Sequence, residues 1–538
     1  MYNQWEQGDG APIEVQLGIR LSACGGHIES NALWSIPRAD GSQRRLLERK
    51  WIAILDQPTL DQLLDAAGLR EVGRIPLGQR AASRERPASF LTMLLCKRRA
   101  DVEERLIAPY AAAGGKPSTV LVAGQGCRVQ DSEGRDYLDT AGGLWSTNCG
   151  LGHPRIIDAI HRQLQALSYG TLFAGRSNDA AQRLTRELLA VAPAPLGWVY
   201  LTNSGSECVE LAIKLARLRA VIDGRRERAI IAYLDQSYHG TFFGAMAVSG
   251  ILEDRDRYGP GLEGTAALPT PDVRQCPPGM AADDYLRQCA RALETLAGAS
   301  AGRVAAVILE PVLGSAGIII PGPAYFAELS AICRRHGILM IVDEVATGFG
   351  RTGHWFASEQ FQLQPDMLLL SKAISGGYLP LGAVLLSNAL GQQFADSGVP
   401  ICHGSSQNGN PACCAAGLAT IEVLGEDGLL ARAGAAGDTL RRSLDALARQ
   451  GLVGAVRAVG LMQAVDLTQD DGSPCTAAQV AAFAACMQER GVLTYRGPGC
   501  LIFMPALTIT DDEIALLAGT LAQVRRGLSL RGGNAHRR

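Results

Sequence analysis

Residues 338–377 read ILMIVDEVATGFGRTGHWFASEQFQLQPDMLLLSKAISGG. Two apolar runs within this segment, Leu339–Val342 and Met367–Leu370, have the length of buried strands. Asp343 ends the first run, and Lys372 follows the second closely. Ligands of open parallel sheets bind at the carboxyl ends of the strands. The segment therefore predicts two buried strands that present an aspartate and a lysine at one edge of a sheet.

The alternation of short apolar runs with helical segments extends along most of the chain. We expect further strands at Val199–Thr202, Ala229–Tyr233 and Val304–Leu309, and helices at Glu207–Ala220 and Tyr325–His336. Such alternation favours a mostly parallel central sheet that is covered by helices. The fold class we predict is α/β, with a large domain around this sheet.

Both ends of the regular region predict a smaller α+β domain. The first end carries the paired strands Val120–Ala123 and Cys127–Asp131, and an amphipathic helix over Pro154–Leu167. The other end mixes helices with the strand-like runs Leu461–Val465 and Cys500–Met504. We predict the following organisation: an N-terminal extension over 1–110, the first part of the small domain over 111–170, the large domain over 171–425, the second part of the small domain over 426–530, and a tail over 531–538.

The composition limits the classes of function. The 538 residues are 47% hydrophobic and 19% charged with a net charge of −2, which predicts a globular chain without a broad basic field for nucleic acid. There is no run of 18 apolar residues and no signal-peptide pattern, so we expect a cytoplasmic protein that does not span a membrane. The 14 cysteines form no Cys-x-x-Cys pair, so neither a disulfide framework nor a metal site is expected.

Lys372 is the strongest candidate for chemistry among only five lysines. Desolvation at a strand end lowers the pKa of an amine, which a Schiff-base lysine requires. The alternative is a solvated lysine in a surface loop. Asp343 at the same edge could hold a cationic ring nitrogen, and its alternative is an ordinary cap of a helix.

Two further segments follow strand candidates. Asn203-Ser204-Gly205-Ser206-Glu207 opens a helix, and backbone N–H groups at a helix N-terminus bind phosphate. Simple capping of the helix by Ser204 and Glu207 is the alternative. Ser237-Tyr238-His239-Gly240 places an aromatic ring at another strand end, where it could stack on a flat ligand. By itself this second segment carries little information.

The segment Gly348-Phe349-Gly350-Arg351-Thr352-Gly353 matches the glycine pattern of dinucleotide-binding folds. Its context argues against that interpretation. Residues 344–347 separate it from the preceding strand, and Asp366 precedes the next strand where the pattern requires an acidic residue at a strand end. We therefore do not expect a dinucleotide site here.

Together these segments resemble the class III aminotransferases, which have the pyridoxal-phosphate (PLP) fold of type I. The resemblance runs from about Pro117 to Gly527. Its most specific part lies between Ile308 and Leu386 and contains, in order, Leu309-Glu310-Pro311, Ile341-Val342-Asp343-Glu344-Val345, Thr347–Gly353, Ser371–Gly377 and Leu381-Gly382-Ala383.

The resemblance implies a role for each matching residue in binding PLP. Lys372 would form the Schiff base and shuttle protons, and Asp343 would pair with the pyridine nitrogen. The remaining cofactor contacts that it implies are Gly205 and Ser206 on the phosphate, Tyr238 and Val345 on the two faces of the ring, and the strand-end Glu310 near the cofactor. The segment His403–Pro411 resembles a loop that reaches the phosphate of the neighbouring subunit's PLP, through Ser405 and Ser406. Family members usually have Thr at position 406 and an aromatic residue at position 407, where this chain has Ser406 and Gln407.

The implied partners are an amine or amino acid donor and a 2-oxo acid, ketone or aldehyde acceptor, used in a ping-pong mechanism by a homodimer with shared active sites. Trp145, Gly404 and Arg496 match positions near the substrate, Arg496 as the guanidinium for a carboxylate. Ordinary core packing of Trp145 and solvation of Arg496 are the alternatives. The same lysine and aspartate would also serve an aminomutase, a racemase or a decarboxylase, and a non-catalytic protein with the same fold is a further alternative.

The N-terminal extension has a second, fainter resemblance. A helix is expected at Leu60–Leu69. The segment Leu60–Leu77, together with Arg86–Leu91, resembles the closing helix and strand of methyltransferases that use S-adenosylmethionine. A strand is expected at Ser89–Cys96. Their glycine-rich loop is absent from the preceding residues, so a working methyltransferase is not expected. A remnant, a docking segment and an arm packed on the dimer are the interpretations left open.

Overall fold

The computed structural model describes the chain in ten stretches: residues 2–6, 12–21, 27–37, 43–53, 69–77, 91–98, 107–110, 119–251, 255–531 and 534–537. The chain divides into two compact units, Met1–Thr119 and Val120–Arg538. The division falls nine residues after position 110, where the sequence analysis placed the end of the extension.

The first unit contains two antiparallel sheets. One has the order β1-β2-β3-β4, with β1 (Tyr2–Glu6), β2 (Pro12–Leu21), β3 (His27–Pro37) and β4 (Gln43–Ala53). The other pairs β5 (Leu69–Leu77) with β6 (Leu91–Arg98), and β6 overlaps the strand expected at Ser89–Cys96. Residues 60–68 of the expected helix, and residues 86–90 of the methyltransferase-like segment, lie outside the described residues.

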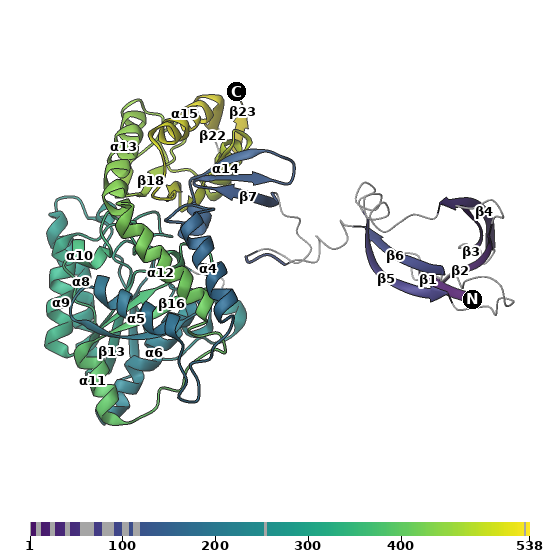
Figure 1. The fold of residues 1–538 in the computed structure, drawn as a ribbon. Helices are drawn as coiled ribbons and strands as arrows, with labels where there is room; N and C mark the ends of the chain where they lie inside the picture. Colours follow the sequence, from purple (N-terminus) through teal and green to yellow (C-terminus); the bar gives the residue numbers. More distant parts are fainter. Residues whose placement is uncertain are drawn as a thin grey trace. The chain divides into compact units, whose positions relative to one another are not determined.

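A seven-stranded sheet lies at the centre of the second unit (Figure 1). Its order is β10-β16-β15-β14-β13-β11-β12. The strands are β10 (Leu196–Thr202), β11 (Ile230–Leu234), β12 (Thr265–Leu268), β13 (Val304–Leu309), β14 (Leu339–Asp343), β15 (Met367–Leu370) and β16 (Gly382–Ser387). Only β16 runs antiparallel to its neighbours β10 and β15, so the predicted mostly parallel sheet is confirmed.

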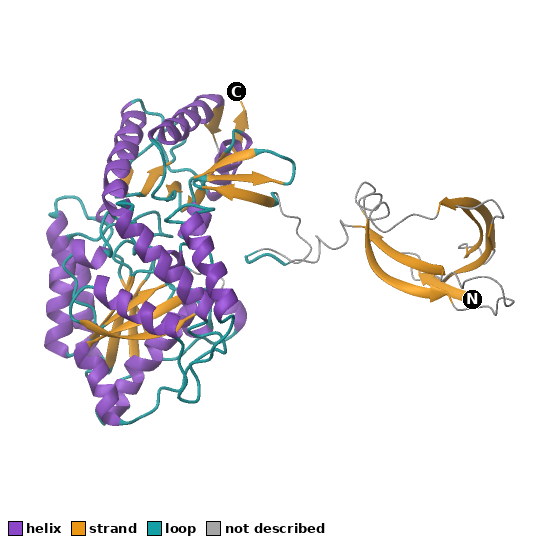
Figure 2. Ribbon diagram, in the orientation of Figure 1, coloured by secondary structure: helices purple, strands orange, loops and turns teal. Residues whose placement is uncertain are grey.

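Helices enclose this sheet (Figure 2), which explains why every residue of β13, β14, β15 and β16 is buried. The helices of this part of the chain are α5 (Asp179–Val191), α6 (Gly205–Ile222), α7 (Phe243–Ala247), α8 (Ala282–Ala299), α9 (Pro323–His336), α10 (Ala357–Gln360), α11 (Asn388–Ser397) and α12 (Pro411–Glu426). Three 3₁₀ turns, η1 (Arg255–Tyr258), η2 (Val273–Gln275) and η3 (Lys372–Ser375), interrupt the connections. Helix α9 shows how the sequence sets such limits: Pro323 starts it, and Gly337 ends it with a left-handed φ of 60°.

Two smaller sheets complete the second unit. One has the order β17-β18-β21-β20, and the other the order β19-β9-β8-β7. Their strands are β7 (Leu121–Gln125), β8 (Arg128–Asp131), β9 (Asp136–Asp139), β17 (Val456–Val459), β18 (Met462–Asp466), β19 (Val492–Leu493), β20 (Tyr495–Gly497) and β21 (Cys500–Phe503). The parallel pairing of β19 with β9 joins residues from both ends of this unit in one sheet.

Further helices and a hairpin belong to the second unit. The helices are α3 (Gly142–Trp145), α4 (Pro154–Ala166), α13 (Leu429–Arg449), α14 (Ala477–Glu489) and α15 (Asp511–Gly527). The hairpin pairs β22 (Leu528–Arg531) with β23 (Asn534–Arg537).

The apolar face predicted for α4 is only partly covered. Of its members, Ile156 is buried, whereas Ile157 is 49% exposed and Leu164 is 48% exposed. A helical apolar stripe normally faces a core. This stripe therefore extends beyond the core of its own chain.

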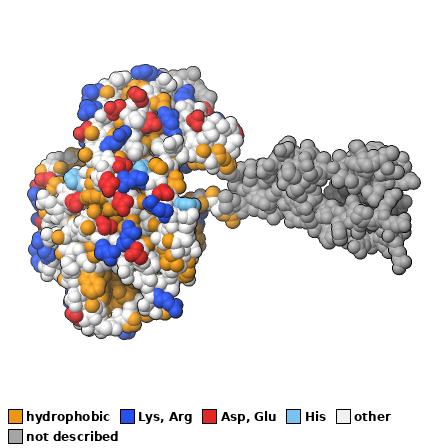
Figure 3. Space-filling view, in the orientation of Figure 1, with side chains coloured by type: hydrophobic (Ala, Val, Ile, Leu, Met, Phe, Trp, Pro, Cys, Tyr) orange, Lys and Arg blue, Asp and Glu red, His pale blue; other side chains and the backbone are white. Residues whose placement is uncertain are grey.

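The charge distribution agrees with the small net charge. Figure 3 shows basic and acidic side chains interspersed over the described part of the face it presents. Among the described residues, no helix is long and apolar enough to cross a membrane. No cluster of three or more potential metal ligands occurs among the side chains that the structure describes.

Candidate active site

The predicted site residues follow the carboxyl ends of neighbouring strands of the central sheet. Lys372 follows β15, Asp343 ends β14, Glu310 follows β13 and Tyr238 follows β11. Because these four strands are parallel neighbours, their ends meet at one edge of the sheet. The fold thus brings together residues that are far apart in the sequence.

The amine of Lys372 lies inside this edge. Its backbone has a φ of 47°, in the left-handed region that lysine seldom adopts. Burial lowers the pKa of the Lys372 amine, and the carboxylates of Asp343 and Glu310 partly oppose this shift. Its Nζ lies 4.9 Å from the centroid of the Trp145 ring. A buried amine with a lowered pKa is poised to act as a nucleophile and as a base.

Each carboxylate oxygen of Asp343 has a partner. Its Oδ1 accepts the backbone N–H of Val345 at 3.0 Å, and its Oδ2 lies 2.7 Å from Nδ1 of His239. Both side chains are buried, and Nε2 of His239 has no hydrogen-bond partner among the described residues. The carboxylate is therefore held in one orientation by a backbone group and a ring.

Glu310 joins two loops at the same edge. Its Oε1 accepts the backbone N–H of Tyr238 at 2.9 Å, and its Oε2 accepts the backbone N–H of Gly314 at 3.1 Å. Burial raises the pKa of the Glu310 carboxyl to about 7, with Asp343 adding to the shift and His239 opposing it. The contact with Tyr238 fixes the loop that carries the predicted stacking aromatic residue.

The start of α6 forms a candidate anion site. Ser204 caps the helix by accepting the backbone N–H of Glu207 at 3.2 Å, so the expected capping is present. Gly205 follows, and a Cβ there would lie 3.1 Å from Cγ1 of Val345 and 3.7 Å from Cβ of Ser371. The first N–H groups of this helix therefore lie beside the residues that follow Asp343 and precede Lys372.

Ser206 connects the same helix start to the loop after β11. Its Oγ accepts the backbone N–H of Thr241 at 3.1 Å. Gly240 has a φ of 117°, and a Cβ at that position would overlap Ser206. Only glycine fits this close approach. The loop that carries Tyr238 is thereby held against the helix start.

The predicted phosphate loop lies on another connection. Gly404 and Ser406 are exposed, and Ser405 is partly exposed. The backbone oxygen of Ser406 accepts the hydroxyl of Tyr169 at 2.9 Å, and a Cβ at Gly404 would lie 2.9 Å from the ring of Phe173. No described hydrogen bond or ion pair joins Ser405 or Ser406 to Lys372.

Of the three residues predicted near the substrate, Trp145 is buried, whereas Gly404 and Arg496 are exposed. Trp145 is only 3% exposed and packs in a core with residues of the small sheets, while its ring also lies beside Nζ of Lys372. Its ring also contacts the ring of Tyr495, with centroids 5.0 Å apart. Arg496, the next residue on β20, is exposed and has no ion-pair partner among the described side chains.

The glycine-rich segment 348–353 has four of its N–H groups bonded to backbone oxygens. The N–H of Phe349 donates to the backbone oxygen of Trp355, and the N–H of Gly350 donates to that of His354. Arg351 in the same segment is fully buried and donates to the backbone oxygens of Leu461 and Pro505. These contacts link the large sheet to the small ones and give the segment a structural role.

Sequence reasoning missed two residues of this site. It quoted His239 only as the neighbour of Tyr238, although a histidine at a strand end two strands away from Asp343 can reach that carboxylate. It gave no role to Gly314, whose N–H binds Glu310. The signal for His239 was in the sequence, whereas the contact of Gly314 depends on the path of a loop.

The fold and this arrangement of lysine, aspartate and helix N-terminus define the PLP enzymes of fold type I. A model of the family "Aminotransferase class-III" matches residues 110–524. The chain belongs to the class III aminotransferases, enzymes that transfer amino groups with PLP as cofactor.

Curated relatives cover most of the chain. An omega-aminotransferase of Caulobacter vibrioides is 33% identical over 412 residues, which are 75% of this chain and 93% of that protein. An adenosylmethionine-8-amino-7-oxononanoate aminotransferase of Nitratidesulfovibrio vulgaris is 32% identical, over 76% of this chain and 77% of that protein.

Solved structures have the same fold. An omega transaminase from Pseudomonas jessenii, in complex with PMP, superposes with a TM-score of 0.75 at 29% identity, over 78% of this chain and 95% of that chain. An (S)-enantioselective omega-transaminase from Thermomicrobium roseum gives a TM-score of 0.76 at 31% identity, over 79% of this chain and 97% of that chain.

Proposed function

We propose that this aminotransferase works through Lys372 and Asp343, with a primary amine or amino acid as donor and a 2-oxo acid, ketone or aldehyde as acceptor. The observation that carries the proposal is the position of Lys372 at the same sheet edge as Asp343, where burial lowers the pKa of an amine whose side chain is otherwise partly exposed. A lysine that must bind a carbonyl carbon and later move a proton needs such an environment.

The residues at this edge fit PLP. Gly205 leaves the N–H groups at the start of α6 open beside Val345 and Ser371, as a phosphate requires. Asp343, held by His239, offers a carboxylate for a cationic ring nitrogen. Tyr238 and Val345 would contact the two faces of the ring. When bound, PLP supplies an electron sink for the carbon that loses its proton.

The chain's own residues would then act in a fixed order. Nζ of Lys372 would hold the cofactor, and a donor amine would displace it. The freed amine would serve as the base that accepts the proton from the donor carbon and as the acid that returns it. Asp343 would hold a cationic ring nitrogen. Water would release the keto product before the acceptor enters, and the same residues would act on the acceptor in the reverse order, which is a ping-pong scheme.

The exposed Arg496 supports an acidic group on one substrate. No described carboxylate neutralises it, and a guanidinium binds carboxylates with paired hydrogen bonds. Trp145 lies between this strand and Lys372, through its contacts with Tyr495 and with Nζ. We propose that Trp145, Gly404 and Arg496 line the substrate path. Relatives include a taurine–pyruvate aminotransferase of Bilophila wadsworthia and a beta-alanine–pyruvate aminotransferase of Pseudomonas aeruginosa, both named for acidic donors.

We propose a homodimer in which Ser405 and Ser406 reach the phosphate of the partner's cofactor. Exposed apolar side chains support the proposal, because such a surface on one chain calls for a partner. Tyr169 and Phe173 contact this loop, and Ile157, Leu164 and Leu167 lie on or directly after α4; their exposed fractions are between 45% and 51%.

We also propose that the enzyme works in the cytoplasm. The cysteines that the structure describes are all unpaired, which suits a reducing compartment.

The absorbance spectrum of the purified enzyme tests the central claim. With PLP, the wild type should show a Schiff-base band at roughly 410–430 nm that a donor amine removes. The Lys372→Ala variant should bind PLP without this band, and Lys116→Ala, which changes another of the few lysines, should keep it. A fully loaded wild type without the band would overturn the role of Lys372.

A further inference from the structure

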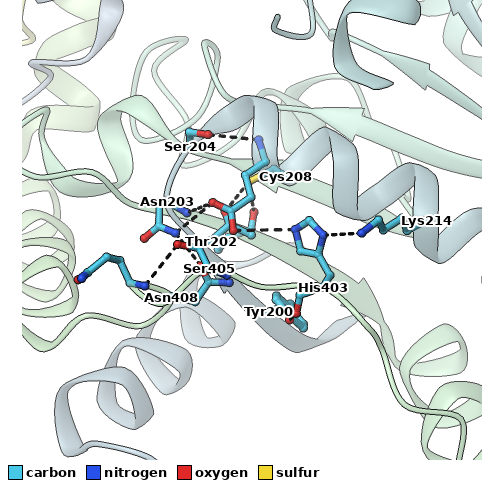
Figure 4. A network of polar contacts seen from close by, with 12 residues as sticks. Tyr200, Thr202, Asn203, Ser204, Cys208, Lys214, His403, Ser405 and Asn408 are labelled. Atoms are coloured by element: carbon cyan, nitrogen blue, oxygen red, sulfur yellow. Dashed lines mark hydrogen bonds and ion pairs between the residues drawn. The ribbon is translucent and has the colours of Figure 1, made fainter. Parts of the chain in front are cut away.

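The start of α6 (Asn203–Glu207) and the loop 403–408 are bonded to each other. The amide nitrogen Nδ2 of Asn203 donates to Oδ1 of Asn408 at 2.6 Å, and the same Oδ1 accepts the N–H of Ser405 at 3.3 Å. Figure 4 shows Asn203, Ser405 and Asn408 gathered at this junction. One amide pair therefore joins the two segments that we propose to bind phosphate. The helix start would bind the phosphate of the chain's own cofactor, and the loop would bind that of the partner subunit's cofactor.

Glu207 forms a second link between the same segments. Its Oε2 accepts both the backbone N–H of Asn203, at 2.9 Å, and its side-chain amide, at 3.0 Å. Its Oε1 has no hydrogen-bond partner and lies 3.9 Å from Nε2 of His403, which also has none. Both side chains are largely buried, with exposed fractions of 12% and 11%. Two buried polar atoms thus face each other slightly beyond hydrogen-bond distance.

Lys214 decides which nitrogen of His403 carries the proton. Its Nζ lies 3.3 Å from Nδ1 of His403, and an ammonium group can only donate. Burial, together with the positive charge of Lys214, lowers the pKa of His403, so the ring is neutral near pH 7. Nδ1 is then the acceptor, and Nε2 carries the hydrogen that points to Glu207. Figure 4 shows His403 between Lys214 and the start of α6.

The backbone of the loop is held to the same elements. The hydroxyl of Tyr200, on β10, donates to the backbone oxygen of His403, and Nζ of Lys214 donates to that of Cys402 at 3.4 Å. A movement of the loop is therefore transmitted to α6 and β10, and a movement of the α6 start is transmitted to the loop.

We propose that Glu207 and Asn408 are positioning residues that couple the two segments, so that cofactor binding in one subunit favours cofactor binding in the other. The inference rests on the proposed dimer and phosphate contacts. Phosphate at the α6 start fixes Asn203 and Glu207, and these fix the loop that serves the other subunit. Coupling between two sites acts equally in both directions, so the two cofactor sites should fill cooperatively.

Calorimetric titration of the apo dimer with 4′-deoxypyridoxine 5′-phosphate tests this coupling. The compound carries the ring and the phosphate but no aldehyde, so Lys372 forms no bond to it. At the low end of common coupling strengths, the second site should bind about fivefold more tightly than the first, which corresponds to a Hill coefficient of about 1.4. Glu207→Gln and Asn408→Ala should each bring the coefficient close to 1.

Glu210→Gln is the matched control, because Glu210 lies one turn further along α6 and binds the N–H groups of Gly244 and Ala245 instead. It should keep the wild-type coefficient. A mere loss of stability would weaken both sites and leave the coefficient unchanged. A wild-type coefficient of 1, or an unchanged coefficient in both Glu207→Gln and Asn408→Ala, would overturn the coupling.

The PLP spectrum and light scattering separate this failure from a failure of the proposed function. A wild type that shows the Schiff-base band as a dimer, yet titrates with a coefficient of 1, would lose only the coupling. A wild type without the band would disprove the proposed role of Lys372. A monomer that shows the band would lose the shared sites, and the coupling would fall with them.

Discussion

Oδ2 of Asp343 and Nδ1 of His239 lie 2.7 Å apart in a fully buried pair. The other carboxylate oxygen accepts the N–H of Val345. His239 thus holds the carboxylate that we propose to keep the cofactor's ring nitrogen protonated. The histidine acts through Asp343 and is a positioning residue.

Replacing His239 should slow the chemistry more than it weakens cofactor binding. Losing a hydrogen bond to a charged group costs about 1.5–3 kcal/mol, or about 10- to 100-fold in rate if the loss falls on the reacting state. We expect His239→Ala to slow the half-reaction with a donor amine by this factor in stopped-flow absorbance. His239→Asn, which keeps a donor, should recover part of the rate. Equal rates in wild type and His239→Ala would refute the positioning role.

Glu310 should make the stability of the apoprotein depend on pH. Burial raises the pKa of its carboxyl from 4.5 to about 7. Folding then favours the protonated form, so its stabilising contribution is full below about pH 4.5 and is lost as the pH rises through 7. Between about pH 5 and pH 8 this loss amounts to about 2.5 kcal/mol. Urea unfolding of the wild type and Glu310→Gln at both pH values measures it.

The difference between these two proteins isolates the titration of Glu310. Glutamine loses one acceptor for the N–H groups of Tyr238 and Gly314, a cost that is the same at every pH. The stability of Glu310→Gln relative to wild type should therefore improve as the pH rises. A constant difference across this range would mean that Glu310 is ionised throughout.

A substitution of Val345 should compensate for the loss of PLP binding that a substitution of Gly205 causes. A Cβ at position 205 would lie 3.1–3.2 Å from the two methyl groups of Val345, so one side must shift. We expect Gly205→Ala to weaken the retention of PLP about tenfold in dialysis followed by absorbance. Gly205→Ala with Val345→Ala should recover part of the loss, because residues in contact have non-additive effects. If the two substitutions weaken the retention of PLP additively, the added methyl group at position 205 does not clash with Val345.

The sequence was sufficient to predict the parts of the fold that depend on local patterns. The strand at Val304–Leu309 and the strand at Met367–Leu370 begin and end where the apolar runs do. Strand β16 was missed as an element because Gly382 weakens the strand pattern, although its neighbours were quoted for the family resemblance. In the structure it pairs antiparallel with both β10 and β15.

Contacts that depend on loop paths could not be predicted in this way. Lys372 and Asp343 follow from strand ends, but the bond of Glu310 to Gly314 and the bond of Asn203 to Asn408 require knowledge of where two loops meet. The extent to which the chain covers the apolar face of α4 could not be predicted either. Periodicity identifies the apolar stripe of Ile157 and Leu164, yet it does not say whether the chain itself or a second copy covers that stripe.

Arg496 should discriminate between acidic and neutral substrates. Its guanidinium is exposed on β20, next to the ring contact of Tyr495 with Trp145. If it binds a substrate carboxylate equally in the ground and transition states, its loss raises KM and leaves kcat unchanged. We expect Arg496→Ala to raise the KM for β-alanine by about 10- to 100-fold, the equivalent of one charged hydrogen-bonded pair. The KM for a neutral primary amine should stay within about twofold. Arg490→Ala is the matched control and should change neither KM, because the side chain of this exposed arginine donates, among the described residues, to the backbone oxygen of Cys486. An equal change in KM for the acidic and the neutral amine in Arg496→Ala would show that Arg496 supports the local fold and does not bind the carboxylate.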